Sequence, residues 1–216
     1  NRARHLTTLA AMISGMVASQ SSQLPRIATK VPSGTKPESR VKRFTRWVDN
    51  AYVTETLYFL PYAQLLLVGL GLETLVLAID GSTVGRGCVA LMVSVIYKGR
   101  ALPIAWLVRE GKKGHFPEQM HIDLIRQVQP LVPPGVEVVL VGDGEFDGIN
   151  LQRTLHGKAQ EGDWFYVCRT ALNTTASLDG QDFRLDVMGT LMKPGTWVAL
   201  EPVYVTSEAY GPVTTI

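Results

Sequence analysis

Two aspartates that each follow an apolar run are the residues of this chain best suited to chemistry. Asp80 follows Leu-Val-Leu-Ala-Ile, and Asp143 follows Val-Val-Leu-Val-Gly. Such runs are typical of buried strands, and functional groups of open α/β sheets gather at the carboxyl ends of strands. On neighbouring strands the two carboxylates can share Mg²⁺ or Mn²⁺, because such ions prefer hard oxygen ligands and leave positions for water or phosphate oxygens. The pair therefore predicts metal-assisted phosphodiester hydrolysis or transfer.

Each aspartate also has a simpler interpretation. An Asp before Gly is a common turn signal, and an Asp can cap a helix. This stays open for either residue alone. Because Asp80 and Asp143 both follow fully apolar runs and both precede Gly, we favour a joint role.

The pattern of apolar residues predicts the elements that must position the two aspartates. Lys98-Gly99 connects two β-type runs tightly, which predicts a hairpin. Pro130 and Pro133-Pro134 end a helical pattern. The expected strands cover residues 75–80, 88–97, 100–108, 136–142 and 164–169, and the expected helices cover residues 117–129 and 147–156.

Three antiparallel strands, a helix, a parallel strand, a helix and a last strand form the order of a ribonuclease H-like fold. We therefore expect an α/β fold with a mixed sheet flanked by helices, and Asp80 and Asp143 on adjacent central strands. The expected parts are a basic helical DNA-binding region over residues 1–50, a catalytic core over 51–172, and the start of a β-rich insertion over 173–216.

The first fifty residues carry the pattern of two helices joined by a linker. Thr35 stands three residues before Glu38, a capping-box spacing that, with Pro37 in the first turn, predicts a helix through Trp47. Residues 19–36 are polar and contain Pro and Gly, which predicts the linker. The first helix is expected from apolar residues at helical spacing, namely Leu6, Leu9, Ala10, Ile13, Met16 and Val17.

The second of these helices is expected to have a basic face. Lys42, Arg43 and Arg46 share this face and could lie against DNA phosphates, although a solvated face explains them equally well. The basic turn with Lys112 and Lys113 is a second candidate for the DNA backbone, again beside a solvated interpretation. The apolar stripe of the same helix is expected at Val41, Phe44 and Val48.

Charge is distributed unevenly along the 216 residues, whose formal net charge is +2. Residues 1–50 contain nine Lys and Arg against two Asp and Glu, and the rest contain twelve against seventeen. Such asymmetry suggests a basic module beside an acidic, metal-binding one, and solvated surface charge gives the same counts. Cys88 and Cys168 lie in apolar stretches without a disulfide or zinc pattern, which predicts buried thiols and a reducing compartment.

No stretch of the sequence is expected to span a membrane. Residues 57–79 are the most apolar, but Pro61, two glycines and Glu73 interrupt them, so that a helix followed by a strand is expected. No cleavage site of a signal peptide follows the apolar residues 6–17. We therefore expect a cytoplasmic protein.

Several motifs together resemble the insertion sequence four group of Asp-Asp-Glu transposases. Gly-Arg-Ala-Leu-Pro in the hairpin is the most specific of them, and the similarity covers roughly residues 6–170. Residues 40–50 are similar to the Arg-rich helix that precedes the catalytic core in this family. The motifs are Leu-Ala-Ile-Asp-Gly-Ser-Thr at 77–83, Tyr-Lys-Gly-Arg-Ala-Leu-Pro-Ile-Ala-Trp at 97–106, Gly-Asp-Gly-Glu-Phe at 142–146 and Trp-Phe-Tyr-Val-Cys-Arg at 164–169.

The resemblance implies an enzyme that cuts and joins transposon ends by two-metal phosphoryl transfer with Mg²⁺ or Mn²⁺. Asp80 and Asp143 match the first two catalytic acids of the family. The implied partner is double-stranded DNA, as transposon ends and as target, and a homodimer is implied in the synaptic complex. The implied location is the bacterial cytoplasm, in association with DNA.

The third acid of the family is a Glu on a helix marked by Tyr, Arg, Glu and Lys, which is not identified in this sequence. Residues 182–215 are expected to form short strands, with turns at 193–195 and 210–212. Glu201 and Glu208 lie there without the flanking motif, so neither is assigned the third role. The chain alone is expected to cleave little, and robust cleavage would mean that Glu145, Glu201 or another acid completes the site.

Two further functions stay open. A truncated or domesticated transposase would bind DNA without catalysis, which agrees with the unassigned third acid. Residues 78–86 also resemble the first phosphate loop of actin-like sugar kinases and chaperone ATPases, which implies a nucleotide phosphotransferase. The basic helical start and the glycine-poor second loop suit that family less well. ATP hydrolysis without DNA would favour it, and metal-dependent nicking of DNA would exclude it.

Overall fold

The computed structural model describes residues 2–85, 87–112, 116–156, 164–206 and 208–216. Contacts divide the chain into two compact units, Asn1–Pro61 and Tyr62–Ile216. Each unit has buried apolar residues of its own.

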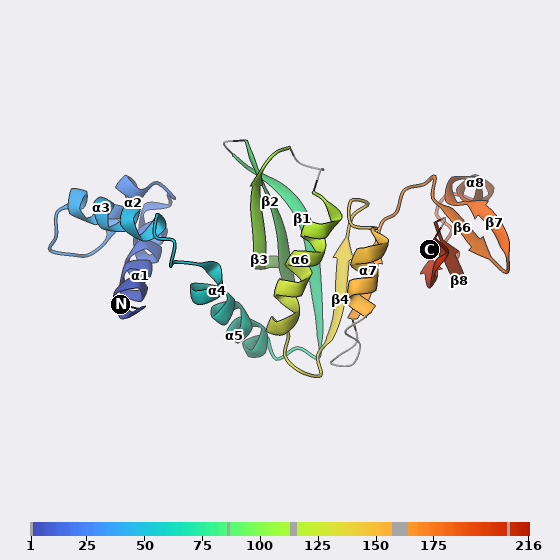
Figure 1. Cartoon of the computed structure of the whole chain (residues 1–216), viewed down its shortest axis with the longest axis horizontal. Coiled ribbons are helices and arrows are strands. Elements are labelled where there is room, and N and C mark those ends of the chain that lie inside the picture. The colour runs from blue at the N-terminus through green and yellow to red at the C-terminus, as the bar shows by residue number, and fades with distance from the viewer. Residues whose placement is uncertain (1, 86, 113–115, 157–163, 207) are drawn as a thin grey trace. The chain divides into compact units, whose positions relative to one another are not determined.

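Helices build the first unit around one apolar cluster. They are α1 (Arg2–Ser19), α2 (Leu24–Lys30), α3 (Pro37–Val48) and α4 (Glu55–Tyr58) (Figure 1). The cluster joins α1, α2 and α3 through Met12, Ile27, Ala28, Val31 and Phe44. At Gly15, α1 comes so close to α2 that an added Cβ would lie 2.6 Å from the carbonyl oxygen of Ile27. A residue without a side chain is therefore what allows the two helices to pack.

The buried face of α1 is not the expected apolar stripe. The helix itself is confirmed, but it buries Thr8, Met12 and Gly15. The close approach at Gly15 determines which face meets α2. Most of the expected stripe is instead between 41% and 68% exposed, namely Leu6, Ile13, Met16 and Val17.

Two further expectations for this unit are wrong. Residues 19–36 are not a simple linker, because α2 lies within them and buries Ile27 and Ala28 completely. The capping box is not formed, because α3 begins at Pro37 after Lys36, and no side chain caps it. Proline at the first position suits a helix start without a capping side chain, since its fixed φ is already helical.

The second unit contains a mixed five-stranded sheet with the order β3-β2-β1-β4-β5. Strands β1, β2 and β3 pair antiparallel, and β4 pairs parallel with both β1 and β5. The expected order of strands and helices is confirmed, and the structure is an α/β protein. The elements are α5 (Leu60–Leu70), β1 (Thr74–Gly85), β2 (Cys88–Tyr97), β3 (Arg100–Glu110), α6 (Glu118–Val128), a 3₁₀ turn (Gln129–Leu131), β4 (Glu137–Gly142), α7 (Ile149–His156) and β5 (Trp164–Cys168).

Two local expectations for this unit are confirmed. Lys98 and Gly99 both have positive φ, 47° and 73°, which suits a two-residue hairpin turn between twisted strands. The apolar stretch before Asp80 is a helix, α5, followed by the strand β1. Within the described part of the chain, no helix is long and apolar enough to cross a bilayer.

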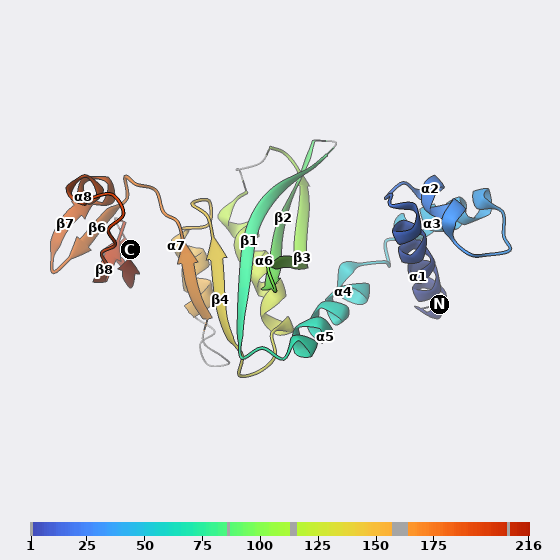
Figure 2. The same ribbon diagram turned by 180° about the vertical axis from the view of Figure 1, so that it is seen from behind.

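Helices α6 and α7 cover one face of the five-stranded sheet but not the other. Helices α6 and α7 lie on one face, in front of the strands in Figure 1 and behind them in Figure 2. This covered face contains Leu75, Leu77 and Ile79 of β1, all at most 3% exposed. We call the opposite face the open face, because six of its large apolar residues are each at least 36% exposed: Val76, Ile96, Val108, Val141, Phe165 and Val167. Met92, Trp106 and Val139 of the same face are half-buried.

The C-terminal part of the second unit forms a separate four-stranded sheet with the order β7-β6-β8-β9. The turn expected at residues 193–195 is confirmed by a hydrogen bond from the N–H of Thr196 to the carbonyl of Lys193 (3.1 Å). The turn expected at 210–212 is wrong, because these residues start β9 and pair with β8. The elements are β6 (Thr175–Leu178), β7 (Gln181–Arg184), α8 (Leu185–Leu191), β8 (Leu200–Val205) and β9 (Tyr210–Thr215), and α8 was not expected.

Candidate active site

Asp80 and Asp143 follow the paired parts of the neighbouring strands β1 and β4. The parallel register pairs Leu77 with Leu140 and Ala78 with Val141, and each aspartate comes two residues after the last of these pairs. Both side chains are exposed. Because side chains alternate between faces along a strand, Asp80 of β1 lies on the open face, whereas Asp143 is the first residue after β4. Neighbouring strands lie about 4.8 Å apart, which makes the two carboxylates candidate ligands of one ion.

Asp80 is not at the end of its strand, which corrects the expected strand over residues 75–80. Strand β1 continues to Gly85, and Asp80 pairs with Met92 of β2. The pairing with β2 overrides the Asp-Gly turn signal. The last pair between β1 and β4 is Ala78 with Val141, so Asp80 lies just beyond the point at which β4 leaves β1.

Asp143 begins a tight turn. Its Oδ1 accepts a hydrogen bond from the N–H of Glu145 (3.0 Å), and its carbonyl accepts one from the N–H of Phe146 (3.1 Å). Phe146 is fully buried. A Cβ on Gly142 would lie 2.8 Å from the Cβ of Phe146, so the turn folds back tightly on the end of β4. Asp143 is therefore a turn residue as well as a candidate ligand.

Glu145 extends toward the covered face of the sheet. Its Oε1 accepts a hydrogen bond from the N–H of Phe116 (3.1 Å), and its Oε2 lies 3.9 Å from where a Cβ on Gly81 would be. Gly81 is buried and alternates with the exposed Asp80, so it belongs to the covered face. This placement does not support Glu145 as a third acid beside Asp80 and Asp143.

Glu118, the first residue of α6, binds the N-terminus of α7. Its Oε1 accepts hydrogen bonds from the N–H groups of Asn150 (2.9 Å) and Leu151 (3.1 Å), and its Oε2 accepts one from the Asn150 amide (3.0 Å). Burial raises the pKa of Glu118, but these hydrogen bonds together hold that pKa below its ordinary value of 4.5. A Cβ on Gly148 would overlap Oε1 of Glu118, so a larger residue there would displace this carboxylate. Glu118 thereby fixes the helix that follows the Asp143 turn.

His121 of α6 is buried and packs against the Asp143 turn. It is 2% exposed, and its ring centroid lies 4.8 Å from that of Phe146 and 6.5 Å from that of Phe116. Its Nε2 has no hydrogen-bond partner within the described part of the chain. Burial lowers the pKa of His121 below 6.5. The carboxylates of Glu145 and Glu118 raise this pKa, but their effect is smaller than that of burial. The neutral imidazole is therefore the form that the fold favours.

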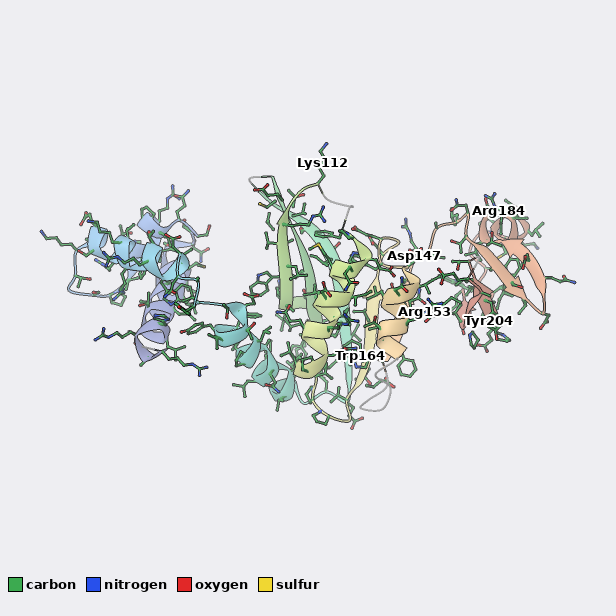
Figure 3. All side chains as sticks on the ribbon, in the orientation of Figure 1. Lys112, Asp147, Arg153, Trp164, Arg184 and Tyr204 are labelled. Atoms are coloured by element: carbon green, nitrogen blue, oxygen red, sulfur yellow. The ribbon has the colours of Figure 1, made fainter. Side chains whose placement is uncertain are left out.

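Glu201 and Glu208, the two glutamates near the second sheet, interact with other residues. Glu201 accepts a hydrogen bond from the hydroxyl of Thr214 (2.9 Å), and Glu208 forms an ion pair with Arg153 of α7 (3.1 Å), which Figure 3 labels. Over the residues that the structure describes, no group of three or more His, Cys, Asp and Glu is arranged to hold a metal ion. Asp80 and Asp143 are thus a pair of candidate ligands without an assigned third.

The basic residues of α3 are divided between surface and core. Lys42, Arg43 and Arg46 are exposed, as phosphate contacts require. Arg40 is only 8% exposed and donates a hydrogen bond to the carbonyl of Val31 at the end of α2. The buried stripe therefore includes Arg40 with Phe44, with Val41 and Trp47 packed at its edge, whereas the expected Val48 is 54% exposed.

The second basic candidate is described only in part. Lys112 follows β3 and is exposed, and its side chain extends away from the sheet (Figure 3). Lys113 lies outside the described residues. Cys88 and Cys168 do not form a disulfide, and both are half-buried rather than buried as expected.

Sequence reasoning missed Glu118 and His121. A signal for Glu118 existed in its position after Pro117, at the start of the expected helix. His121 lies three residues before Leu124, on the buried face of α6, so its burial could have been predicted. Their partners on α7 and in the Asp143 turn left no signal in the sequence.

Comparison with known proteins gives no match. No family model matches this chain, and no curated protein or solved structure matches it. The candidate site therefore depends on the register and the contacts described above.

Proposed function

We propose that this chain is the core of an Asp-Asp-Glu type DNA transposase with a ribonuclease H-like fold. The observation that carries the proposal is the register of the neighbouring central strands β1 and β4, which pairs Ala78 with Val141, each two residues before an exposed aspartate, Asp80 or Asp143. The strand order, with three antiparallel strands followed by two parallel ones, supports it. The motifs around both aspartates and in the hairpin add to this support.

The donor set suits Mg²⁺ or Mn²⁺, because both ligands are carboxylates and neither is buried. Asp80 would be the shared ligand of two ions, and Asp143 would hold one of them. Bound ions would supply charge neutralisation to the attacking and leaving oxygens of the transferred phosphate. Asp80 lies beyond the last β1–β4 pair and is exposed, so a DNA phosphate would approach it from that side.

The basic residues would bind the DNA that this chemistry requires. Lys42, Arg43 and Arg46 on α3 would contact backbone phosphates, and so would Lys112 after β3 together with Lys113, the next residue in the sequence. The excess of nine basic over two acidic residues in positions 1–50 supports a DNA-binding first unit. A homodimer on paired transposon ends and a bacterial cytoplasmic location belong to the same proposal.

The test replaces each aspartate with asparagine. Asn keeps the size of the side chain and the Oδ1 acceptor that binds the N–H of Glu145, so the fold should survive D80N and D143N. We expect both variants to lose Mn²⁺ binding, measured by titration calorimetry, and to lose any metal-dependent nicking of plasmid DNA.

Asp123→Asn is the matched control for these variants. Asp123 is exposed on α6, where it accepts a hydrogen bond from the side-chain amide of Gln119 (2.8 Å) and forms a long surface ion pair with Arg126 (3.9 Å), and exposed interactions of this kind have small energetic value. The Asp123→Asn variant should bind Mn²⁺ as the wild type does. Undiminished Mn²⁺ binding by D80N or D143N would remove that aspartate from the metal site.

A second candidate is a DNA-binding protein without catalysis. The described residues do not bring a third His, Cys, Asp or Glu to the two aspartates, which favours it. Wild-type protein that binds DNA but neither binds Mn²⁺ nor nicks DNA would establish this alternative. A nucleotide phosphotransferase has less support, because Gly81, Ser82 and Thr83 pair with β2 instead of forming a phosphate loop.

A further inference from the structure

The turn after β4 is fastened to the start of α6 on the covered face of the sheet. Glu145 accepts the N–H of Phe116, a residue 29 positions earlier in the chain. The ring of Phe146 packs on His121 of α6, with 4.8 Å between ring centroids. Phe116 in turn covers Gly81, where a Cβ would lie 2.8 Å from its ring. These contacts meet behind both aspartates, since Gly81 follows Asp80 and Phe146 closes the Asp143 turn.

We infer that Glu145 is a positioning residue for Asp143. The Asp143 carboxylate binds the backbone N–H of Glu145, so the orientation of that backbone determines where Oδ1 lies. The side chain of Glu145 fixes this backbone from the other side by its bond to Phe116. The inference rests on the proposed function in one respect, that the positioned carboxylate is a metal ligand.

The partner of Glu145 is itself held in place. Phe116 is 6% exposed, and the guanidinium of Arg109 lies 5.8 Å from its ring centroid. A hydrogen bond to a charged acceptor is stronger than one between neutral groups, and here the donor is a backbone group that has little room to move. Groups behind a metal ligand commonly determine its orientation, and their loss costs about 10–100-fold in metal affinity or activity.

The test compares Glu145→Ala with Glu145→Gln. Gln keeps an oxygen that can accept the N–H of Phe116, whereas Ala removes it. Glu137→Ala is the matched control, because Glu137 also accepts one hydrogen bond, from the hydroxyl of Thr74 (3.1 Å), at the opposite end of the β1–β4 pair. The readouts are residue-resolved amide hydrogen exchange and Mn²⁺ affinity by calorimetry, both on the full chain.

For E145A we expect exchange at Phe116 and at residues 144–146 to accelerate while the rest of the sheet keeps its rate. Mn²⁺ affinity should fall about tenfold in this variant. E145Q should keep wild-type exchange and wild-type Mn²⁺ affinity. E137A should change neither the exchange of the Asp143 turn nor the affinity.

Four outcomes would overturn the inference. Wild-type local exchange in E145A would show that the bond to Phe116 does not hold the turn. Equal acceleration throughout the sheet would reduce Glu145 to a general stabilising role. Loss of Mn²⁺ binding in E145Q, with unchanged exchange, would make Glu145 a ligand itself. Accelerated local exchange in E145A at unchanged Mn²⁺ affinity would show that the Asp143 turn does not determine Mn²⁺ affinity.

Failure of the proposed function gives a different result. If the wild-type chain binds no Mn²⁺, the metal-dependent function is excluded, whatever the Glu145 variants do. The exchange comparison of E145A with E145Q then decides alone whether Glu145 holds the Asp143 turn.

Discussion

His121 is a buried titratable residue whose charged neighbours are the carboxylates of Glu145 and Glu118. Burial lowers its pKa below 6.5, although both carboxylates act in the opposite direction. In the unfolded chain an exposed histidine titrates near its ordinary value of about 6.5. As the pH falls, His121 is therefore protonated at a higher pH in the unfolded chain than in the folded one. The folded state therefore loses stability as the pH falls from 6.5 toward the lower pKa of His121.

His121→Leu should remove this part of the pH dependence. The slope of the free energy of unfolding against pH, measured by urea titration from about pH 7 down to pH 5, should decrease by up to about 1.4 kcal/mol per pH unit, the limit for one proton. Glu118, whose pKa is lowered from 4.5, contributes only at lower pH. An unchanged slope in this variant would assign the acid sensitivity to another group.

The sequence was sufficient to propose Asp80 and Asp143 as candidates, because an apolar run before an acid is a local pattern. It was not sufficient to assign Glu118 and Glu145. Their partners lie 32 and 29 positions away and are backbone N–H groups, which every residue other than proline offers. Tertiary contacts of this kind have no signature in residue type.

Helix α3 combines a structural arginine with an exposed basic face. Arg40 binds the end of α2, while Lys42, Arg43 and Arg46 point into solvent. Neutralising these three as a triple Gln variant should weaken binding to DNA of any sequence. The dependence of log affinity on log salt should flatten by roughly one unit per lost phosphate contact, measured by fluorescence anisotropy at several salt concentrations.

A triple Gln variant of Lys98, Arg100 and Lys193 is the control for α3, because it removes the same charge from exposed positions elsewhere. Its salt dependence should stay close to that of the wild type. If the α3 variant also keeps the wild-type slope, its basic face is simply solvated.

Most helices and strands followed from periodicity, and the exceptions have physical causes. Strand β1 is longer than expected because pairing with β2 carries it through Asp80-Gly81. Helix α2 was overlooked because it has seven residues in a polar segment, and its two buried residues gain stability from packing on α1. In α1 the buried face is determined by the close approach to α2 at Gly15 and not by the apolar stripe. Pattern predicts that an element exists more reliably than it predicts which face is buried.

At the scale of the whole chain, two units with separate cores should respond separately to mutation. Phe44→Ala removes a fully buried ring from the cluster of the first unit, a change that costs about 3–5 kcal/mol. Hydrogen exchange should accelerate within residues 1–61 while Mn²⁺ binding by the second unit is retained. Leu140→Ala, at a fully buried position in β4, should give the reverse pattern. Equal acceleration throughout the chain in either variant would show that the two units unfold together.

The open face of the sheet has a consequence for the fate of this chain in a cell. Its exposed residues include Val76, Val141, Phe165 and Val167, which are contributed by the parallel strands β1, β4 and β5. Parallel strands are normally covered on both faces, and exposed apolar surface promotes aggregation and capture by chaperones. The quality-control machinery of the cell therefore has a binding surface on the chain even when the chain is folded. The steady-state amount of the chain should accordingly depend on chaperone capture and proteolysis as well as on its rate of synthesis.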